Sequence, residues 1–181
     1  QEDSWEGFSV TNRAAKDPKR QIQGAVSRAQ GKRFEERLDD SFAYYADRGF
    51  AIVEKTPEPM RPTKSLGNGK FIAFFEKKAQ PDYKGTIKGG RTVLFEAKFT
   101  STDRMTQDRV GRDQSEYLSR YQRLGARCYV VAGFASGDVY RIPWDVWSNM
   151  KTFFGRKYVK ETDLEKFRVH IAWNGVLQLL A

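Results

Sequence analysis

The sequence predicts a single α/β domain in which a mixed sheet is flanked by helices. Two segments, 25–48 and 113–124, carry apolar residues at helical spacing. Between and after them, several short runs rich in β-branched and aromatic residues are typical of strands. The order helix, three or four strands, helix, two strands, helix and strand favours a mainly antiparallel meander that leads into a crossover helix.

The composition permits one folded domain and favours a polyanionic partner. The chain has 181 residues, of which 39% are hydrophobic, enough for a core of its own. It carries 32 Lys and Arg against 23 Asp and Glu, a formal net charge of +9. No apolar run approaches the length of a membrane span, so we expect no membrane partner. We expect residues 1–23 to form a flexible polar arm and residues 24–181 to form the domain.

The first expected helix, residues 25–48, has one acid on its apolar side. Its stripe ends before Gly49, a natural helix stop, and consists of Phe34, Leu38, Phe42 and Tyr45. Glu35 lies three residues before Leu38 and therefore falls on the inward face. Spacing alone leaves two explanations open: Glu35 lies at the edge of a slightly rotated helix, or it has a functional role.

A short strand at 51–53 is followed by a long excursion at 56–69. This excursion is rich in proline and glycine and contains the basic residues Arg61 and Lys64. An ordinary surface loop is the simplest interpretation. The next five residues, 71–75, are strongly apolar and predict a further strand.

Residues 83–87 and 91–99 predict a hairpin joined through Lys88-Gly89-Gly90. Side chains alternate across a strand, so one face of the second strand is apolar throughout and the other is mixed. The apolar face holds Val93, Phe95, Ala97 and Phe99; the mixed face holds Leu94, Glu96 and Lys98.

Asp82, immediately before this hairpin, joins Glu96 and Lys98 to make a set with nuclease-like chemistry. Two carboxylates can hold Mg²⁺, and a nearby lysine can orient or activate a water and stabilise developing negative charge. The simpler alternative is a solvated strand face that carries an ordinary Glu–Lys pair.

The second expected helix follows a loop that contains Arg104, Arg109 and Arg112. We expect Asp113 to be its N-cap and Gly125 to end it, with an apolar stripe of Tyr117, Leu118, Tyr121 and Leu124. Gln114 faces the sheet from the first helical turn, where it either serves a site or caps the helix.

The remaining segments predict buried strands at 128–134 and 138–142, a helix that starts at Pro143, and closing strands within 167–180. The single cysteine, Cys128, lies in a strand and is expected to be a core thiol. With His170 as the single histidine, sites built from several cysteines or histidines are excluded. No phosphate-cradling loop of the ATPase type is present, so we expect no nucleotide cofactor.

Four separated motifs together resemble the RecU-type Holliday junction resolvases of the PD-(D/E)xK nuclease superfamily. They are Gly31-Lys32-Arg33-Phe34-Glu35, Pro81-Asp82-Tyr83-Lys84-Gly85, Phe95-Glu96-Ala97-Lys98-Phe99-Thr100 and Asp113-Gln114-Ser115-Glu116. The resemblance runs from about Gly31 to about Pro143 and implies a restriction-endonuclease-like core. It also implies that the excursion at 56–69 is a stalk that enters the centre of a four-way junction.

The resemblance further implies the composition of the site. Asp82, Glu96 and the backbone carbonyl of Ala97 would bind the metal, Mg²⁺ with Mn²⁺ as a substitute. Lys98 would assist the attacking water, and Glu35 and Gln114 would complete the catalytic set. The family acts as a homodimer that nicks two strands symmetrically, in the cytoplasm of a bacterial or phage-infected cell.

We therefore expect a Mg²⁺-dependent endonuclease that resolves four-way DNA junctions. One alternative is a related nuclease that acts on duplex, flap or single-stranded DNA; another is a non-catalytic DNA-binding protein on the same scaffold. We expect DNA contacts from the basic residues Lys32, Arg33, Arg61, Lys64, Lys84, Arg104, Arg109 and Arg112.

Overall fold

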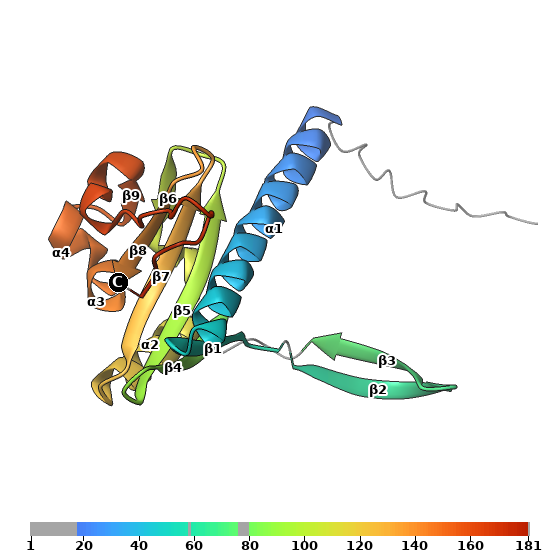
Figure 1. The fold of residues 1–181 in the computed structure, drawn as a ribbon. Coiled ribbons are helices and arrows are strands. Elements are labelled where there is room, and N and C mark those ends of the chain that lie inside the picture. The colour runs from blue at the N-terminus through green and yellow to red at the C-terminus, as the bar shows by residue number, and fades with distance from the viewer. Residues whose placement is uncertain (1–17, 58, 76–79, 181) are drawn as a thin grey trace, which may run out of the picture.

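The computed structural model describes residues 18–57, 59–75 and 80–180 and is built around a five-stranded mixed sheet (Figure 1). The strand order is β1-β4-β5-β7-β8. Neighbouring strands are antiparallel except β5 and β7, which are parallel. The strands are β1 (Ala51–Lys55), β4 (Tyr83–Ile87), β5 (Arg91–Thr100), β7 (Arg127–Phe134) and β8 (Val139–Pro143). The predicted mixed α/β fold with a crossover helix before β7 is confirmed.

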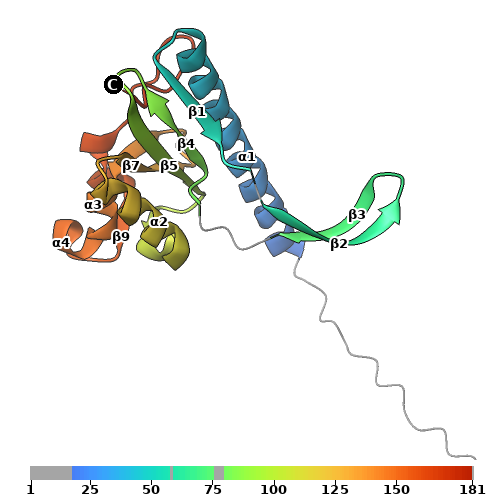
Figure 2. The ribbon, with the colours of Figure 1, turned by 90° about the horizontal axis from the view of Figure 1, so that it is seen from below.

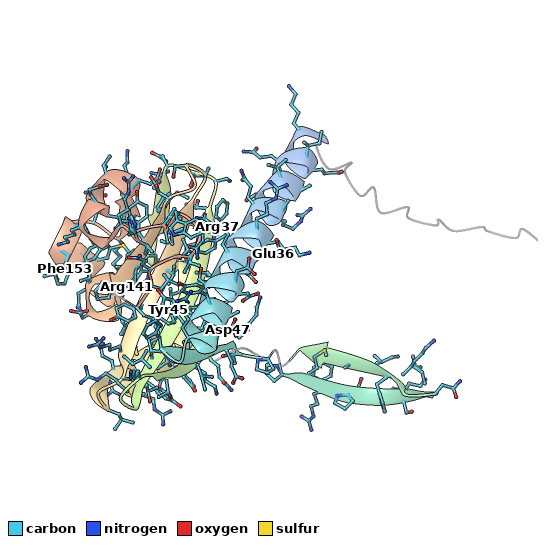
Figure 3. All side chains as sticks on the ribbon, viewed as in Figure 1. Glu36, Arg37, Tyr45, Asp47, Arg141 and Phe153 are labelled. Carbon is cyan, nitrogen blue, oxygen red and sulfur yellow. The ribbon has the colours of Figure 1, made fainter. Side chains whose placement is uncertain are left out.

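Helix α1 (Pro18–Asp47) covers one face of this sheet. Its predicted stripe of Phe34, Leu38, Phe42 and Tyr45 is buried. Figure 3 shows Tyr45 and Arg37 on the sheet side of α1 and Glu36 on its outer side. Tyr45 donates a hydrogen bond to the Leu177 carbonyl (3.1 Å), which ties α1 to the C-terminal segment.

The helix begins earlier than predicted. Residues 18–23, which we expected in the arm, form the first turns of α1. Proline is well tolerated in the first helical turn because no intrahelical partner exists there for its missing N–H. The apolar stripe starts only at Phe34, so periodicity gave no signal for these turns. The rest of the predicted arm, residues 1–17, lies outside the described residues.

Three short helices cover the other face: α2 (Arg112–Arg123), α3 (Trp144–Ser148) and α4 (Met150–Phe154). They share a buried core with Leu94, Val130 and Ile142 of the sheet. The N-cap of α2 is Gly111, not the predicted Asp113. Leu124, which we expected in the apolar stripe, is exposed because it follows the last turn of α2. Gly125 ends the helix region as predicted, with φ +90°.

The segment after Pro143 differs from the single helix predicted. Asn149 separates α3 from α4, and its side-chain amide donates to the Asp145 carbonyl at 2.8 Å. The expected closing strands within 167–180 are only isolated bridges, Tyr140 with Arg168 and Ile171 with Leu177. A small sheet of β6 (Arg104–Thr106) and β9 (Tyr158–Lys160) was not predicted, because each strand has only three residues. Single 3₁₀ turns complete the fold at Gln107–Arg109 (η1), Glu161–Asp163 (η2) and Glu165–Phe167 (η3).

The excursion after β1 is a separate hairpin of β2 (Met60–Gly67) and β3 (Lys70–Phe75). Figures 1 and 2 show that it extends away from the main sheet. The predicted strand at 71–75 is therefore not part of the core: it forms the second arm of the excursion, which is longer than the predicted 56–69. Its large apolar side chains are at least half exposed at Met60, Leu66, Phe71, Ile72 and Phe74.

Two glycines allow close packing around the sheet. A Cβ at Gly133 of β7 would lie 2.7 Å from the Phe34 ring. The close contact between α1 and β7 therefore requires a residue without a side chain at position 133. A Cβ at Gly85 of β4 would lie 1.9 Å from the Ile52 carbonyl oxygen on β1. Within the described residues, no helix is long and apolar enough to cross a membrane.

Candidate active site

Strand β5 places Glu96 and Lys98 on the face that α2 covers. The predicted alternation is confirmed: Val93 and Phe95 pack with the α1 core, whereas Leu94 packs with the α2 core. Both faces are covered, so even the polar position Glu96 is fully buried. This burial argues against the solvated strand face that the sequence left open for Glu96.

Asp82 reaches the same point from the neighbouring strand. The β4–β5 ladder ends at the pair Tyr83 and Phe95. One step further on, the Ala97 amide donates to Asp82 Oδ2 at 2.9 Å instead of to a backbone carbonyl. The N–H and C=O of a strand residue point to the same side of the strand, so the Ala97 carbonyl faces this open edge as well.

The carboxylate of Glu96 is buried and only partly neutralised. Lys98 Nζ donates to Glu96 Oε1 in a direct ion pair. Burial, followed by the negative charge of Asp82, raises the pKa of Glu96 to about 7, and Lys98 offsets this only in part. The second oxygen, Oε2, is buried without a hydrogen-bond partner among the described residues. A buried carboxylate oxygen in this state is costly unless another cation reaches it.

These donors fit a hard divalent cation. Two carboxylates and a backbone carbonyl are the oxygen ligands that Mg²⁺ prefers, and Mg²⁺ usually takes few protein ligands and completes its shell with water and phosphate. The described residues contain no cluster of three or more acidic, histidine or cysteine side chains. The site therefore suits a cation that shares its coordination with a substrate.

Glu35 lies at the edge of α1 and is not aimed into the sheet. Its carboxylate is about half exposed and pairs with Lys55 of β1 at 2.6 Å. That hydrogen bond is the main reason why the pKa of Lys55 is raised, and the charges of Asp39 and Asp82 add to it. Lys55 Nζ also lies 5.9 Å from the ring centroid of Tyr83, the residue that follows Asp82 in the chain. The structure therefore shows the first explanation for Glu35, a position at the edge of the helix stripe. From this edge Glu35 pairs with Lys55, whose charge interacts with that of Asp82.

Sequence reasoning missed Lys55. The available signal was its place at the end of β1, where it pairs in register with Tyr83.

Gln114 caps its own helix in this structure. Its Oε1 accepts the Gly111 amide at 3.3 Å. No described contact joins its side chain to Asp82, Glu96 or Lys98, so its catalytic role stays a prediction.

The basic residues expected to contact DNA lie on the surface but not in one place. Arg61 and Lys64 are on the β2–β3 hairpin, and Lys84 is on β4, where it donates to Gln80 at 3.1 Å. Lys32 and Arg33 are exposed on α1, and Lys32 pairs with Glu36 at 3.7 Å. Arg104, Arg109 and Arg112 follow the end of β5, beyond Lys98.

Comparison with known proteins identifies the family of the chain. The sequence model of the family described as RecU, recombination protein U, matches residues 29–180. The Holliday junction resolvase RecU of Bacillus pumilus is 30% identical over 158 residues, which cover 81% of this chain and 75% of that protein. The protein of that name from Streptococcus gordonii is 29% identical over 121 residues, 63% of this chain and 60% of that protein. A solved structure, the Holliday junction resolvase Hjc of Archaeoglobus fulgidus, covers 81% of this chain with 17% identity and a TM-score of 0.46.

Proposed function

The chain belongs to the RecU family, and on this premise we propose that it is a metal-dependent endonuclease that resolves four-way DNA junctions. Relatives that align with most of the chain bear the name Holliday junction resolvase. One observation carries the proposal: Glu96, buried beside Asp82 and Lys98, has a carboxylate oxygen that no described group satisfies. A DNA-binding scaffold without chemistry would gain nothing from such a costly arrangement.

We assign the reaction to these side chains as follows. Asp82, Glu96 and the Ala97 carbonyl would hold Mg²⁺, or Mn²⁺ in its place, which would neutralise charge on the phosphate and activate water. Lys98, positioned by Glu96, orients the attacking water and stabilises charge that develops on the phosphate. Water attacks in line with the leaving oxygen and leaves 5′-phosphate and 3′-hydroxyl ends. Glu35 and Gln114 support the site from the two flanking helices.

The β2–β3 hairpin is the element that we assign to junction selectivity. Its exposed apolar side chains, together with Arg61 and Lys64, suit contact with unstacked bases and with the phosphate backbone. A junction offers both at its centre, whereas a regular duplex keeps its bases stacked. We further propose that two copies act together, because symmetric resolution needs one active site for each of two strands. We also propose that the protein acts in the cytoplasm.

The test is cleavage of a synthetic mobile junction and of a matched duplex, with Mg²⁺, with Mn²⁺ and with EDTA. We expect cleavage of the junction only, and only with metal. Equal cutting of both substrates would refute junction selectivity. No cutting with either metal would favour the non-catalytic alternative.

The variant Asp82→Asn tests the site itself. We expect it to abolish cleavage and to retain junction binding, because it removes a charge from the metal site without changing the fold. A fully active Asp82→Asn protein would remove this residue from the mechanism.

A further inference from the structure

A polar cavity opens just beyond the end of β5. Its volume is about 280 Å³, and its polar lining comes from Ser27 of α1, from Thr100, Ser101 and Thr102, and from Arg104, Thr106 and Arg109. Its polar lining therefore consists of hydroxyl groups and two guanidinium groups. Among the described residues, no carboxylate lines it.

The hydroxyl groups of this cavity are held in place by one another and by the backbone. The Thr100 and Thr102 hydroxyls lie 2.9 Å apart, and the Thr102 hydroxyl also bonds the Arg104 carbonyl at 2.9 Å. Ser101 Oγ lies 3.4 Å from Ser27 Oγ and thereby joins the loop to α1. This network fixes the cavity wall before any ligand binds.

The two arginines leave their positive charge available. Arg109 donates to the Phe99 carbonyl at 2.7 Å, which orients the guanidinium without neutralising it. Arg104 lies 5.6 Å from the Tyr158 ring centroid. Neither arginine forms a salt bridge in the described residues. Of the two carboxylates next to these arginines in sequence, Asp103 is paired with Lys160 at 3.4 Å, and Asp108 does not line the cavity. A ligand with negative charge and several acceptor oxygens matches this lining.

The cavity lies a short distance from the candidate active site along the same strand. Thr100 and Lys98 point to the same face of β5, two residues apart, which corresponds to roughly 6.6 Å along a strand. A DNA strand carries one phosphate per about 3.4 Å of its helix axis. Measured along one DNA strand, the cavity is therefore about one or two phosphates away from the position of the scissile phosphate.

We propose that this cavity binds a backbone phosphate of the cleaved DNA strand, one or two nucleotides from the scissile phosphate, and sets the register of the strand in the active site. The inference rests on the proposed function. The role is one of positioning: Arg104 and Arg109 hold the neighbouring phosphate so that the scissile one faces Asp82 and Glu96.

The experiment combines charge-neutral DNA with charge-neutral protein. Junctions carry a single methylphosphonate at one of the three phosphates on either side of the scissile bond. Their binding is measured by fluorescence anisotropy without metal, and their cleavage with Mg²⁺. The proteins are the wild type, Arg104→Gln, the double variant Arg104→Gln/Arg109→Gln, and the control Arg91→Gln. Arg91 is an exposed arginine at the opposite end of β5.

We expect one methylphosphonate position to weaken binding by the wild type and by Arg91→Gln about tenfold, the lower range for a charge-assisted hydrogen bond. The same substitution should cost the double variant less than about twofold, because the contact is already lost. The single variant Arg104→Gln leaves the Arg109 contact to Phe99 intact, so it should show part of this loss without a change in thermal stability. In the double variant, the slope of the logarithm of the binding constant against the logarithm of salt concentration should become shallower by about the contribution of one phosphate contact.

Equal methylphosphonate penalties in the wild type and in the double variant, at every position, would overturn the cavity as a phosphate site. Because binding is measured without metal, this result is independent of catalysis. Absence of cleavage by the wild type with Mg²⁺ and with Mn²⁺ would instead overturn the proposed function, while the binding comparison would still decide the cavity.

Discussion

Replacing Glu96 by glutamine should make the metal-free protein more stable at neutral and alkaline pH, although it removes half of an ion pair. The pKa of Glu96 is raised from 4.5 to about 7, chiefly by burial. Each pKa unit corresponds to about 1.36 kcal/mol, so ionised Glu96 costs the folded state about 3 kcal/mol relative to the unfolded chain. Glutamine has the same shape and carries no charge, so it avoids this cost.

The pH window follows from the sign of the pKa change. Below about pH 4.5 Glu96 is protonated in both the folded and the unfolded state and contributes nothing. Between about 4.5 and 7 the unfolded chain loses its proton while the folded protein keeps it, so the stability of the wild type falls as pH rises. Above about 7 the full cost of about 3 kcal/mol is present.

The assay is urea unfolding of both proteins in EDTA at several pH values from 4 to 8.5. Titrating groups that do not interact with Glu96 affect the two proteins alike, so the difference in their unfolding free energies reports on Glu96 and its neighbours Asp82 and Lys98. That difference should grow by about 3 kcal/mol in favour of Glu96→Gln between the two ends of the range. A difference that is independent of pH would refute the claim that Glu96 is held in a charge-unfavourable site.

Metal should remove most of this difference. At pH 8, Mg²⁺ at 100 times its dissociation constant should stabilise the wild type by about 2.7 kcal/mol. It should leave Glu96→Gln almost unchanged. Equal stabilisation of both proteins would show that the metal binds without Glu96.

Three further outcomes follow from the packing. Gly133→Ala should destabilise the protein by about 1–3 kcal/mol in urea unfolding, because its Cβ would meet the Phe34 ring, whereas Gly31→Ala, with open space around it, should not; equal stabilities would contradict this packing. Glu35→Gln should cost less than about 1 kcal/mol of stability, because its pair with Lys55 is half exposed; it should still lower cleavage, and unchanged cleavage would remove Glu35 from the site. The buried Cys128 thiol, with its pKa raised to about 12 by burial, should resist a thiol reagent at pH 8 until urea unfolds the chain; rapid labelling of the native protein would contradict its burial.

The central strands and the location of the candidate site could be predicted because they depend on local periodicity. Period-two alternation in β5 separates Phe95 from Glu96 whatever the rest of the chain does. The glycine turn between β4 and β5, with φ +94° at Gly89 and +83° at Gly90, is equally local. In this region the prediction erred only by one residue at the end of β5.

Contacts between distant elements could not be predicted in the same way. The ion pair of Lys55 and Glu35 depends on how α1 crosses β1, and no spacing within either segment encodes that crossing. The spacing of Gln114 from the apolar stripe was equally compatible with a role as a helix cap and with a role in the site. The structure shows the cap, in which the Gly111 amide donates to the Gln114 side chain, and the catalytic role of Gln114 stays a prediction.

The β2–β3 hairpin shows what a local apolar run can predict and what it cannot. The five apolar residues 71–75 predicted a strand correctly, but the run alone does not say whether that strand lies in the core. In the structure Phe71, Ile72 and Phe74 are at least half exposed, on a hairpin that pairs with no third strand within the part of the chain that the structure describes. Such a hairpin is marginally stable alone, and a contiguous exposed apolar surface marks a binding region. Replacing residues 60–75 by a short Gly-Ser linker should therefore weaken junction binding far more than duplex binding in a competition assay, with the unfolding free energy of the remaining domain nearly unchanged. An equal loss for both DNAs would mean that the hairpin supplies general charge contacts only.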